Sequence, residues 1–190
     1  GRIVPVLAGS ALHPGLASPI LDALVDLIPS PVERPAVTAA VARGGAREMT
    51  ADPNGPLAAL VFKTAADPFV GKLSYFRVYS GTLSPQVQLW NSGAWQGERI
   101  GTLFVPRGRA QEPVERLVAG DIGALAKLSA TATGHTLTTQ EEGLALEGVK
   151  FPEPVYSIAL HPKSKADLDK MGAALHRLME EDPALQMRRE

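Results

Sequence analysis

The chain has 190 residues, of which 45% are hydrophobic and 21% charged, with 19 lysines and arginines against 20 acidic residues. This composition is typical of a soluble globular protein with room for one domain or two small ones. The absence of cysteine excludes disulfides and thiolate metal sites and fits a cytoplasmic location. No apolar run approaches the roughly 20 residues that span a bilayer, so no membrane partner is expected. The near-neutral charge argues against broad capture of nucleic acid but leaves a local basic patch open.

The first 34 residues predict a strand, a loop and a helix. Val4–Ala8 has the apolar character of a short buried strand, and Gly9-Ser10-Ala11 follows as a loop. Ser18 and Pro19 predict a helix start, because a hydroxyl can cap the first turn and the missing proline amide costs nothing there. Helical spacing of apolar residues continues to Ile28, where Pro29 ends the helix.

Residues 35–55 carry prolines, glycines and scattered charge without a sustained period, so we expect a linker there. From residue 56 to 140 the pattern changes to short strands separated by turns, which predicts a small closed barrel. The predicted strands are Leu57–Thr64, Leu73–Tyr79, Val87–Trp90, Arg99–Val105, Ile122–Leu128 and a short piece near Thr136.

The strand Leu73–Tyr79 is expected at the centre of this barrel. Side chains alternate between the two faces of a strand, so Phe76 and Val78 share one face while Tyr75 and Arg77 share the other. We expect the Phe76 face to be the core. Gly81 supplies the backbone freedom that the following turn requires.

A second linker is expected over residues 141–152. Val155–Leu160 then predicts a strand, and Ser164 with Asp167 predicts the capped start of a helix over 165–181. One stripe of this helix is apolar: Leu168, Met171, Leu175, Leu178 and Met179.

Several of these strings resemble elongation factor G. The run ADPFVGKL from Ala66 to Leu73, the run RVYSGTL from Arg77 to Leu83 and the run VERLVAGDIGA from Val114 to Ala124 resemble its second domain. Residues 1–34 resemble the last strand and helix of a translational GTPase's nucleotide domain, and residues 153–190 resemble the start of the third domain. Gln86 stands where the family usually has glycine and His135 where it usually has aspartate, which indicates a divergent relative or paralogue.

The resemblance implies a mainly β fold with α+β flanks. A translation-factor-type β-barrel (56–140) would be preceded by a strand–helix remnant of a P-loop GTPase domain (1–34). It would be followed by a truncated ferredoxin-like unit (153–190), so the chain would be a fragment of a longer protein. In that family the Ser-Ala of the guanine loop presents backbone amides to the base, a role that would fall on Ser10 and Ala11.

The parent protein would bind the ribosome, through ribosomal RNA and small-subunit protein, and couple hydrolysis of GTP with magnesium to translocation. The barrel would dock on the small subunit and relay the nucleotide state to later domains. This stretch lacks the Gly-x-x-x-x-Gly-Lys-Ser/Thr phosphate loop, so we expect it to have no GTPase activity, no catalytic residue and no bound cofactor of its own. Arg107 and Arg109 flank a turn at the barrel rim, where exposed charge and phosphate contact on ribosomal RNA are both open readings.

The remaining polar residues predict no chemistry. His13, His135, His161 and His176 lack metal-ligand spacing, so no metal site is expected. The carboxylates at Glu141-Glu142 and Glu180-Glu181-Asp182 are expected to be solvated. The alternatives to a translocase are a ribosomal protection protein, a release-factor-type GTPase, or a nucleotide-free adaptor that binds RNA or protein. Because the 165–181 helix would expose its apolar stripe, it is expected to pack on the same segment of a second copy, giving a non-native homodimer, or on the Ile20–Ile28 helix.

Overall fold

The computed structural model describes residues 3–67, 70–108, 110–139 and 142–188, which divide into two units, Gly1–Arg34 and Pro35–Glu190. The first unit holds α1 (Ala17–Leu27) between two short 3-10 helices, Pro14–Leu16 and Pro31–Glu33. The helix is confirmed, although it begins one residue before Ser18, which therefore lies in its first turn. The strand predicted at Val4–Ala8 is wrong: these residues form no strand, and the described part of the chain gives them no neighbouring strand to pair with.

The second unit is built almost entirely from antiparallel strands. These are β1 (Val37–Val41), β2 (Ala46–Met49), β3 (Ala58–Asp67), β4 (Gly71–Ser80), β5 (Thr82–Leu83), β6 (Gln88–Asn91), β7 (Gln96–Arg99), β8 (Leu103–Arg107), β9 (Ala110–Val114), β10 (Leu117–Val118), β11 (Ile122–Ala126), β12 (Thr136–Thr138) and β13 (Leu144–Leu146). One helix, α2 (Lys165–Glu181), follows them.

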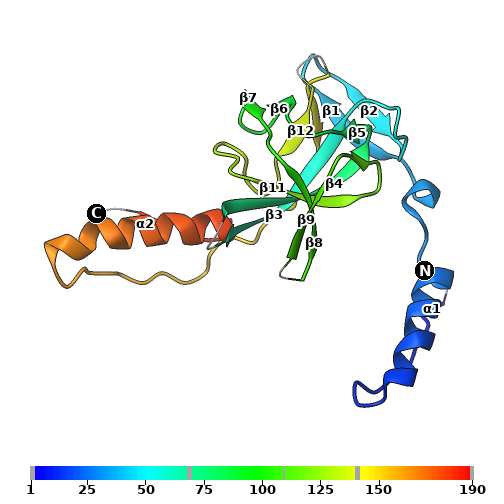
Figure 1. Cartoon of the computed structure of the whole chain (residues 1–190). Coiled ribbons are helices and arrows are strands. Elements are labelled where there is room, and N and C mark those ends of the chain that lie inside the picture. Colours follow the sequence, from blue (N-terminus) through cyan, green and yellow to red (C-terminus); the bar gives the residue numbers. More distant parts are fainter. Residues whose placement is uncertain (1–2, 68–69, 109, 140–141, 189–190) are drawn as a thin grey trace. The chain divides into compact units, whose positions relative to one another are not determined.

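Eight strands form one sheet in the order β7-β6-β12-β3-β4-β11-β8-β9, and Figure 1 shows them curving around a common interior. A single core cluster draws side chains from nearly all of these strands and from the β5–β10 pair. Its members are Leu57, Ala59, Val61, Phe76, Val78, Leu83, Leu89, Ile100, Leu103, Leu117, Leu125, Leu128 and Leu137. The expected barrel is therefore present.

The predicted facing of the central strand is confirmed. Phe76 and Val78 on β4 are fully buried in the core, whereas Tyr75 and Arg77 are partly exposed. Gly81 ends the strand with φ +80°, and a Cβ there would lie 2.7 Å from the Leu57 Cα. Only glycine meets both conditions without displacing backbone.

Parts of both expected linkers form strands. β1 pairs with β2 and also with β13, so residues 37–49 and 144–146 form one three-stranded sheet. Ala39, Met49, Leu144 and Leu146 pack with Ala58 and Leu60 of β3 in a second, smaller core. The strands of this sheet are short and come from two distant parts of the chain, so neither part has a clear strand pattern by itself.

Two further strand predictions need correction. The segment predicted at Arg99–Val105 is divided between β7 and β8, with a break over residues 100–102. Residues 155–160 form no strand, and Val155 is fully exposed. The helix after them matches its predicted range, and the Ser164 hydroxyl bonds the Asp167 carboxylate at 2.6 Å. No described residue of α2 is buried.

The central position of Phe76 makes its substitution a test of the barrel register. We expect Phe76→Ala to lower the free energy of unfolding by about 3–5 kcal/mol, because it leaves a cavity in a close-packed core. Chemical denaturation followed by tryptophan fluorescence measures this, with Tyr75→Ala as the control on the opposite face of the same strand. A larger loss in the control than in Phe76→Ala would contradict the register.

Candidate functional site

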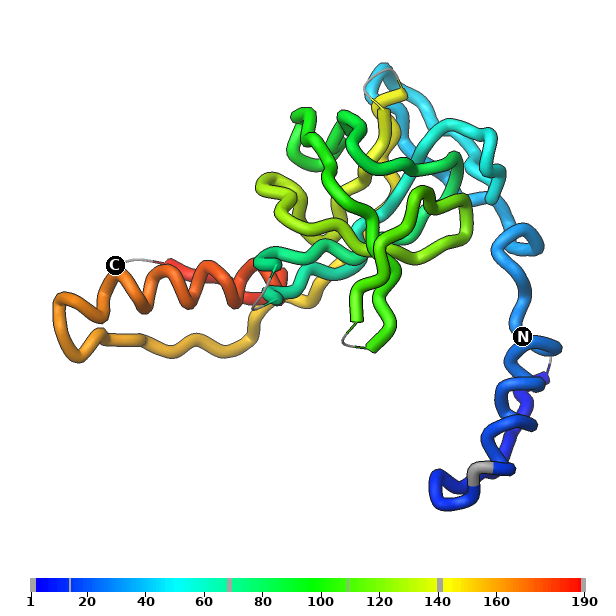
Figure 2. The backbone as a smooth tube through the Cα atoms, viewed as in Figure 1, coloured from blue at the N-terminus to red at the C-terminus, as the bar shows by residue number. Residues whose placement is uncertain are grey.

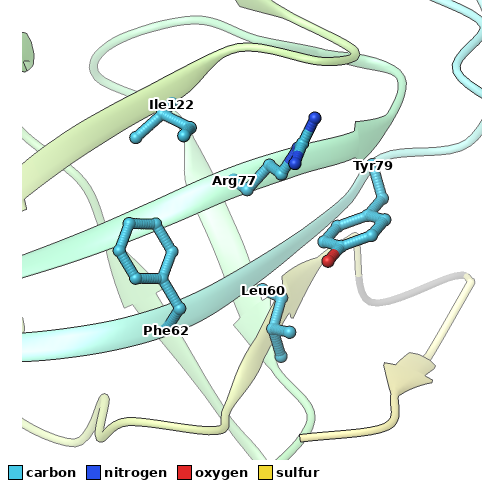
Figure 3. Close-up of a pocket in the computed structure, with 5 residues that line it drawn as sticks. All are labelled: Leu60, Phe62, Arg77, Tyr79 and Ile122. Carbon is cyan, nitrogen blue, oxygen red and sulfur yellow. The ribbon is translucent and has the colours of Figure 1, made fainter. Parts of the chain in front are cut away.

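The outer face of the barrel carries a shallow hollow of about 250 Å³ lined by Leu60, Phe62, Arg77, Tyr79 and Ile122. Figure 3 shows these side chains rising from three adjacent ribbons, with Arg77 between Ile122 and Tyr79. Phe62 is 39% and Ile122 47% exposed, whereas Leu60 is buried at its floor. The hollow is therefore largely apolar and open, with one guanidinium inside it.

Strand alternation explains why these residues meet. Arg77 lies directly opposite Leu60 on β3 and opposite Ile122 on β11, so the three share the outward face. The β3–β4 register shifts between Val61 and Lys63, and Phe62 occupies the irregularity. A bulge of this kind redirects one side chain relative to its neighbours.

Arg77 stacks on an aromatic ring within the hollow. Its guanidinium carbon lies 5.9 Å from the centroid of the Tyr79 ring, a cation–π distance. The arrangement could receive an apolar side chain or a planar group beside a fixed positive charge. Sequence reasoning places Arg77 and Tyr79 on one face, but it does not foresee the hollow, because the bulge at Phe62 has no sequence signature.

The β8–β9 hairpin carries the predicted basic site, and Figure 2 shows it extending from the barrel as a pair of green segments. Arg107 at the end of β8 is 71% exposed and pairs with Glu112 at 3.0 Å, Nε to Oε2. Such an exposed pair contributes little stability, so the guanidinium can exchange Glu112 for a phosphate. Arg109 lies outside the described residues.

The predicted guanine loop lies in the first unit. The Ser10 hydroxyl accepts a hydrogen bond from the Leu12 amide at 3.3 Å, and the Ser10 carbonyl accepts one from the His13 amide, also at 3.3 Å. These bonds turn the chain back on itself. Among the described residues no hydrogen bond uses the amides of Ser10 or Ala11.

The barrel also contains a buried polar network that the sequence does not predict. Glu98 lies opposite the core residue Leu89 in the β6–β7 register and is only 7% exposed. Burial raises the pKa of its carboxyl, but four hydrogen bonds outweigh burial and hold the pKa below its ordinary value of 4.5. The donors are the Thr131 hydroxyl, the Ala130 backbone amide at 2.8 Å, the Asn91 side-chain amide (Nδ2) at 3.3 Å and the Ser129 hydroxyl at 3.4 Å.

The network fixes residues 129–135 against the strands. Asn91 accepts hydrogen bonds from the amides of Gly93 and Ala94, 3.0 Å each, and so shapes the β6–β7 turn. His135 packs against that turn, because a Cβ on Gly93 would lie 2.5 Å from its ring. Burial lowers the pKa of His135 below 6.5; the Glu98 carboxylate opposes this shift, and the Lys72 ammonium adds to it.

Metal chemistry and membrane insertion find no support in the described part of the chain. No group of three or more histidines or carboxylates there could hold a metal ion. The two α-helices there are too short or too polar to cross a bilayer.

Comparison with known proteins identifies the family. Residues 56–140 match the family model for elongation factor G domain 2, and residues 151–190 match the model for elongation factor G domain III. A solved protein from Thermus thermophilus is similar to 91% of this chain at 31% sequence identity and a TM-score of 0.69. The chain belongs to the elongation factor G family. It spans 24% of that solved relative's length.

The features described above fall within the two matched domains. The barrel with its outer hollow, the Arg107 hairpin and the Glu98 network lies within the domain 2 match, and α2 lies within the domain III match. The chain therefore contains an elongation factor G-type β-barrel followed by a segment of domain III.

The lowered pKa values of Glu98 and His135 predict how the free energy of unfolding depends on pH. Both folded-state pKa values are lowered, so the folded state binds fewer protons than the unfolded chain. The contribution of these two groups to stability is complete above pH 6.5. It falls below pH 6.5 because the unfolded chain protonates His135 more readily, and falls again below pH 4.5 because the unfolded chain protonates Glu98 more readily. Thermal unfolding from about pH 8 to about pH 3.5 measures this.

The His135→Gln variant should remove the upper step of that profile, between pH 6.5 and the lowered pKa of His135. His176→Gln, on an exposed position of α2, is the matched control and should keep the parent's profile. An unchanged upper step in His135→Gln would contradict the assignment.

Proposed function

We propose that the protein to which this chain belongs is a ribosome-dependent GTPase that couples hydrolysis of GTP, with magnesium, to translocation during protein synthesis in the cytoplasm. The observation that carries this proposal is the succession of domain 2 and domain III matches along one chain. The ribosome would be the partner, through ribosomal RNA and small-subunit protein. The barrel would dock on the small subunit and relay the nucleotide state to later domains.

The exposed β8–β9 hairpin supports a contact with ribosomal RNA. Arg107 holds its charge in solvent at the end of a hairpin, and its partner among the described residues is Glu112, which is itself half exposed. A phosphate would replace that carboxylate with a similar charge-assisted hydrogen bond. Arg109 is proposed as a second phosphate contact on the strength of sequence alone.

Two other proposals concern nucleotide and assembly. Ser10 and Ala11 would contribute backbone amides to the guanine site of the whole protein, a site that needs further residues to bind nucleotide. A second copy of the chain remains a proposed partner for the apolar stripe of α2, where Leu168 and Leu178 are each 49% exposed.

The alternative is a relative with the same barrel but another outcome on the ribosome. His135, in the place of the family's usual aspartate, packs on the β6–β7 turn and so changes a structural position in the barrel, which favours a divergent paralogue as the second candidate. Translocation, ribosome protection and peptide release assays with the full-length protein separate these functions. If the full-length protein showed no ribosome-stimulated GTP hydrolysis in any of these assays, the proposal would be contradicted and a nucleotide-free adaptor would be favoured.

The docking proposal predicts selective binding to the small subunit. We expect this chain to bind isolated small subunits more tightly than large ones in a sedimentation assay. Arg107→Glu should weaken that binding by about tenfold and reduce its dependence on salt, as expected when one phosphate contact is lost. Arg43→Glu makes the same charge change at an exposed turn and should bind like the parent. Equal losses in the two variants would refute a specific role for Arg107.

The chain by itself should not bind GTP measurably. Ser10 and Ala11 offer two amides, and no phosphate loop is present in the sequence, so too few contacts oppose the entropy cost of binding. Calorimetric titration of GTP with magnesium tests this, and a micromolar dissociation constant would show the prediction wrong.

A further inference from the structure

Two adjacent carboxylates at the C-terminal end of α2 are exposed, as the sequence predicts, and each also has a partner on the barrel. The Glu181 Oε1 atom accepts a hydrogen bond from the Ala66 amide at 2.5 Å. The Glu180 Oε1 atom lies 3.4 Å from the Lys72 Nζ atom. The two contacts join residues that are more than 100 positions apart in sequence.

The partners on the barrel belong to one structural unit. Ala66 on β3 and Lys72 on β4 are directly opposite each other in the strand register, near the end of the β3–β4 hairpin. Two consecutive helix residues therefore contact the two members of one cross-strand pair. Such a match relates the helix end to both strands of the hairpin.

The backbone around Ala66 explains why a carboxylate is accommodated there. β12 pairs with β3 only over residues 58–60, so β3 beyond that point has no described strand on this side. An edge strand of this kind leaves amides unpaired, and the Glu181 carboxylate bonds one of them. A charged acceptor makes a stronger hydrogen bond than a neutral one.

The helix itself gains nothing from these two glutamates. The C-terminal end of a helix carries partial negative charge, which disfavours carboxylates and favours basic side chains. The last turn of α2 nevertheless has no basic residue and contains both Glu180 and Glu181. Residues that are unfavourable for their own helix are expected where they make a tertiary contact instead.

Lys72 links this contact to the interior of the barrel. Its carbonyl accepts a hydrogen bond from the Lys127 amide, 2.8 Å away, just after β11. Its side chain is only 17% exposed, and its charge acts on His135 in the network that includes Glu98. A displacement of the helix end would therefore act on Lys72, which is tied to residues on both sides of the hairpin.

We propose that Glu180 and Glu181 form a latch that holds the start of domain III against the end of the β3–β4 hairpin. The latch is a two-point contact, one ion pair and one amide bond, and it opens when either domain shifts. As a step in the relay between domains, it rests on the proposed function. The contact itself needs neither ribosome nor nucleotide, and it can be tested on this chain.

The absence of cysteine allows a direct distance measurement. Cysteines introduced at the exposed positions Gln88 on β6 and His176 on α2 would carry two spin labels. We expect a single narrow distance distribution in the parent background. Glu180→Lys combined with Glu181→Ala should broaden it several-fold, while the fluorescence of Trp90 and Trp95 shows that the barrel remains folded.

Matched variants separate a latch from a general change of charge. Asp169→Lys makes the same reversal at an exposed position on the same helix and should leave the distribution narrow. Lys72→Glu alone should broaden it, and Lys72→Glu with Glu180→Lys should restore most of the narrow component by reversing the ion pair.

Circular dichroism supplies an independent readout. Replacing Glu180 and Glu181 removes unfavourable charge from the helix end, so helical content should stay equal or rise while the distance distribution broadens. A distribution that stays narrow in the double variant, or a charge reversal that fails to restore it, would overturn the latch. Either result would leave the small-subunit binding assay unaffected, so failure of the latch is distinguishable from failure of the proposed function.

Discussion

The antiparallel pairing of β3 with β4 is the constraint on which the rest of the structure depends. These are the two longest strands, ten residues each, and β12 and β11 extend the sheet from their outer edges. Because strand side chains alternate, the pair presents Val61, Phe76 and Val78 to the barrel core and Leu60, Arg77 and Tyr79 to the outside. A slip of one residue would exchange these two sets and lose both the core and the hollow.

The two ends of this hairpin serve different purposes. At one end Gly81 turns the chain tightly beside Leu57, and the smaller core of the β1–β2–β13 sheet packs on Ala58 and Leu60. At the other end β3 runs beyond its β12 partner, and the chain there meets the carboxylates of α2. The hairpin is thus packed against two hydrophobic cores at one end. At the other end it is held by two polar contacts with α2. A contact that must release is better placed at the second end, because few buried groups oppose its opening.

Sequence reasoning succeeds where a segment carries its own signal. The facing of Phe76 and Val78, the range of α2 and the turn at Gly81 all follow from alternation, helical spacing and glycine chemistry. It fails where the signal depends on a distant partner. β1 and β13 are short and irregular in pattern, and they become strands because they pair across more than 90 residues. Val4–Ala8 and residues 155–160 have apolar patterns, yet the described part of the chain gives them no neighbouring strand and they remain outside its sheets.

The same limit governs the polar residues. Glu98 looks like an ordinary surface glutamate in the sequence, but its hydrogen bonds to Ser129, Ala130 and Thr131 come from a loop more than 30 residues later. Glu180 and Glu181 are expected in solvent, and both are exposed, but the sequence does not predict their partners on the barrel. The one local clue is physical: carboxylates crowd a helix end whose dipole disfavours them. Such a conflict between a residue and its own element is visible in the sequence and is a reason to look for a tertiary partner, but the partner itself is found only in the structure.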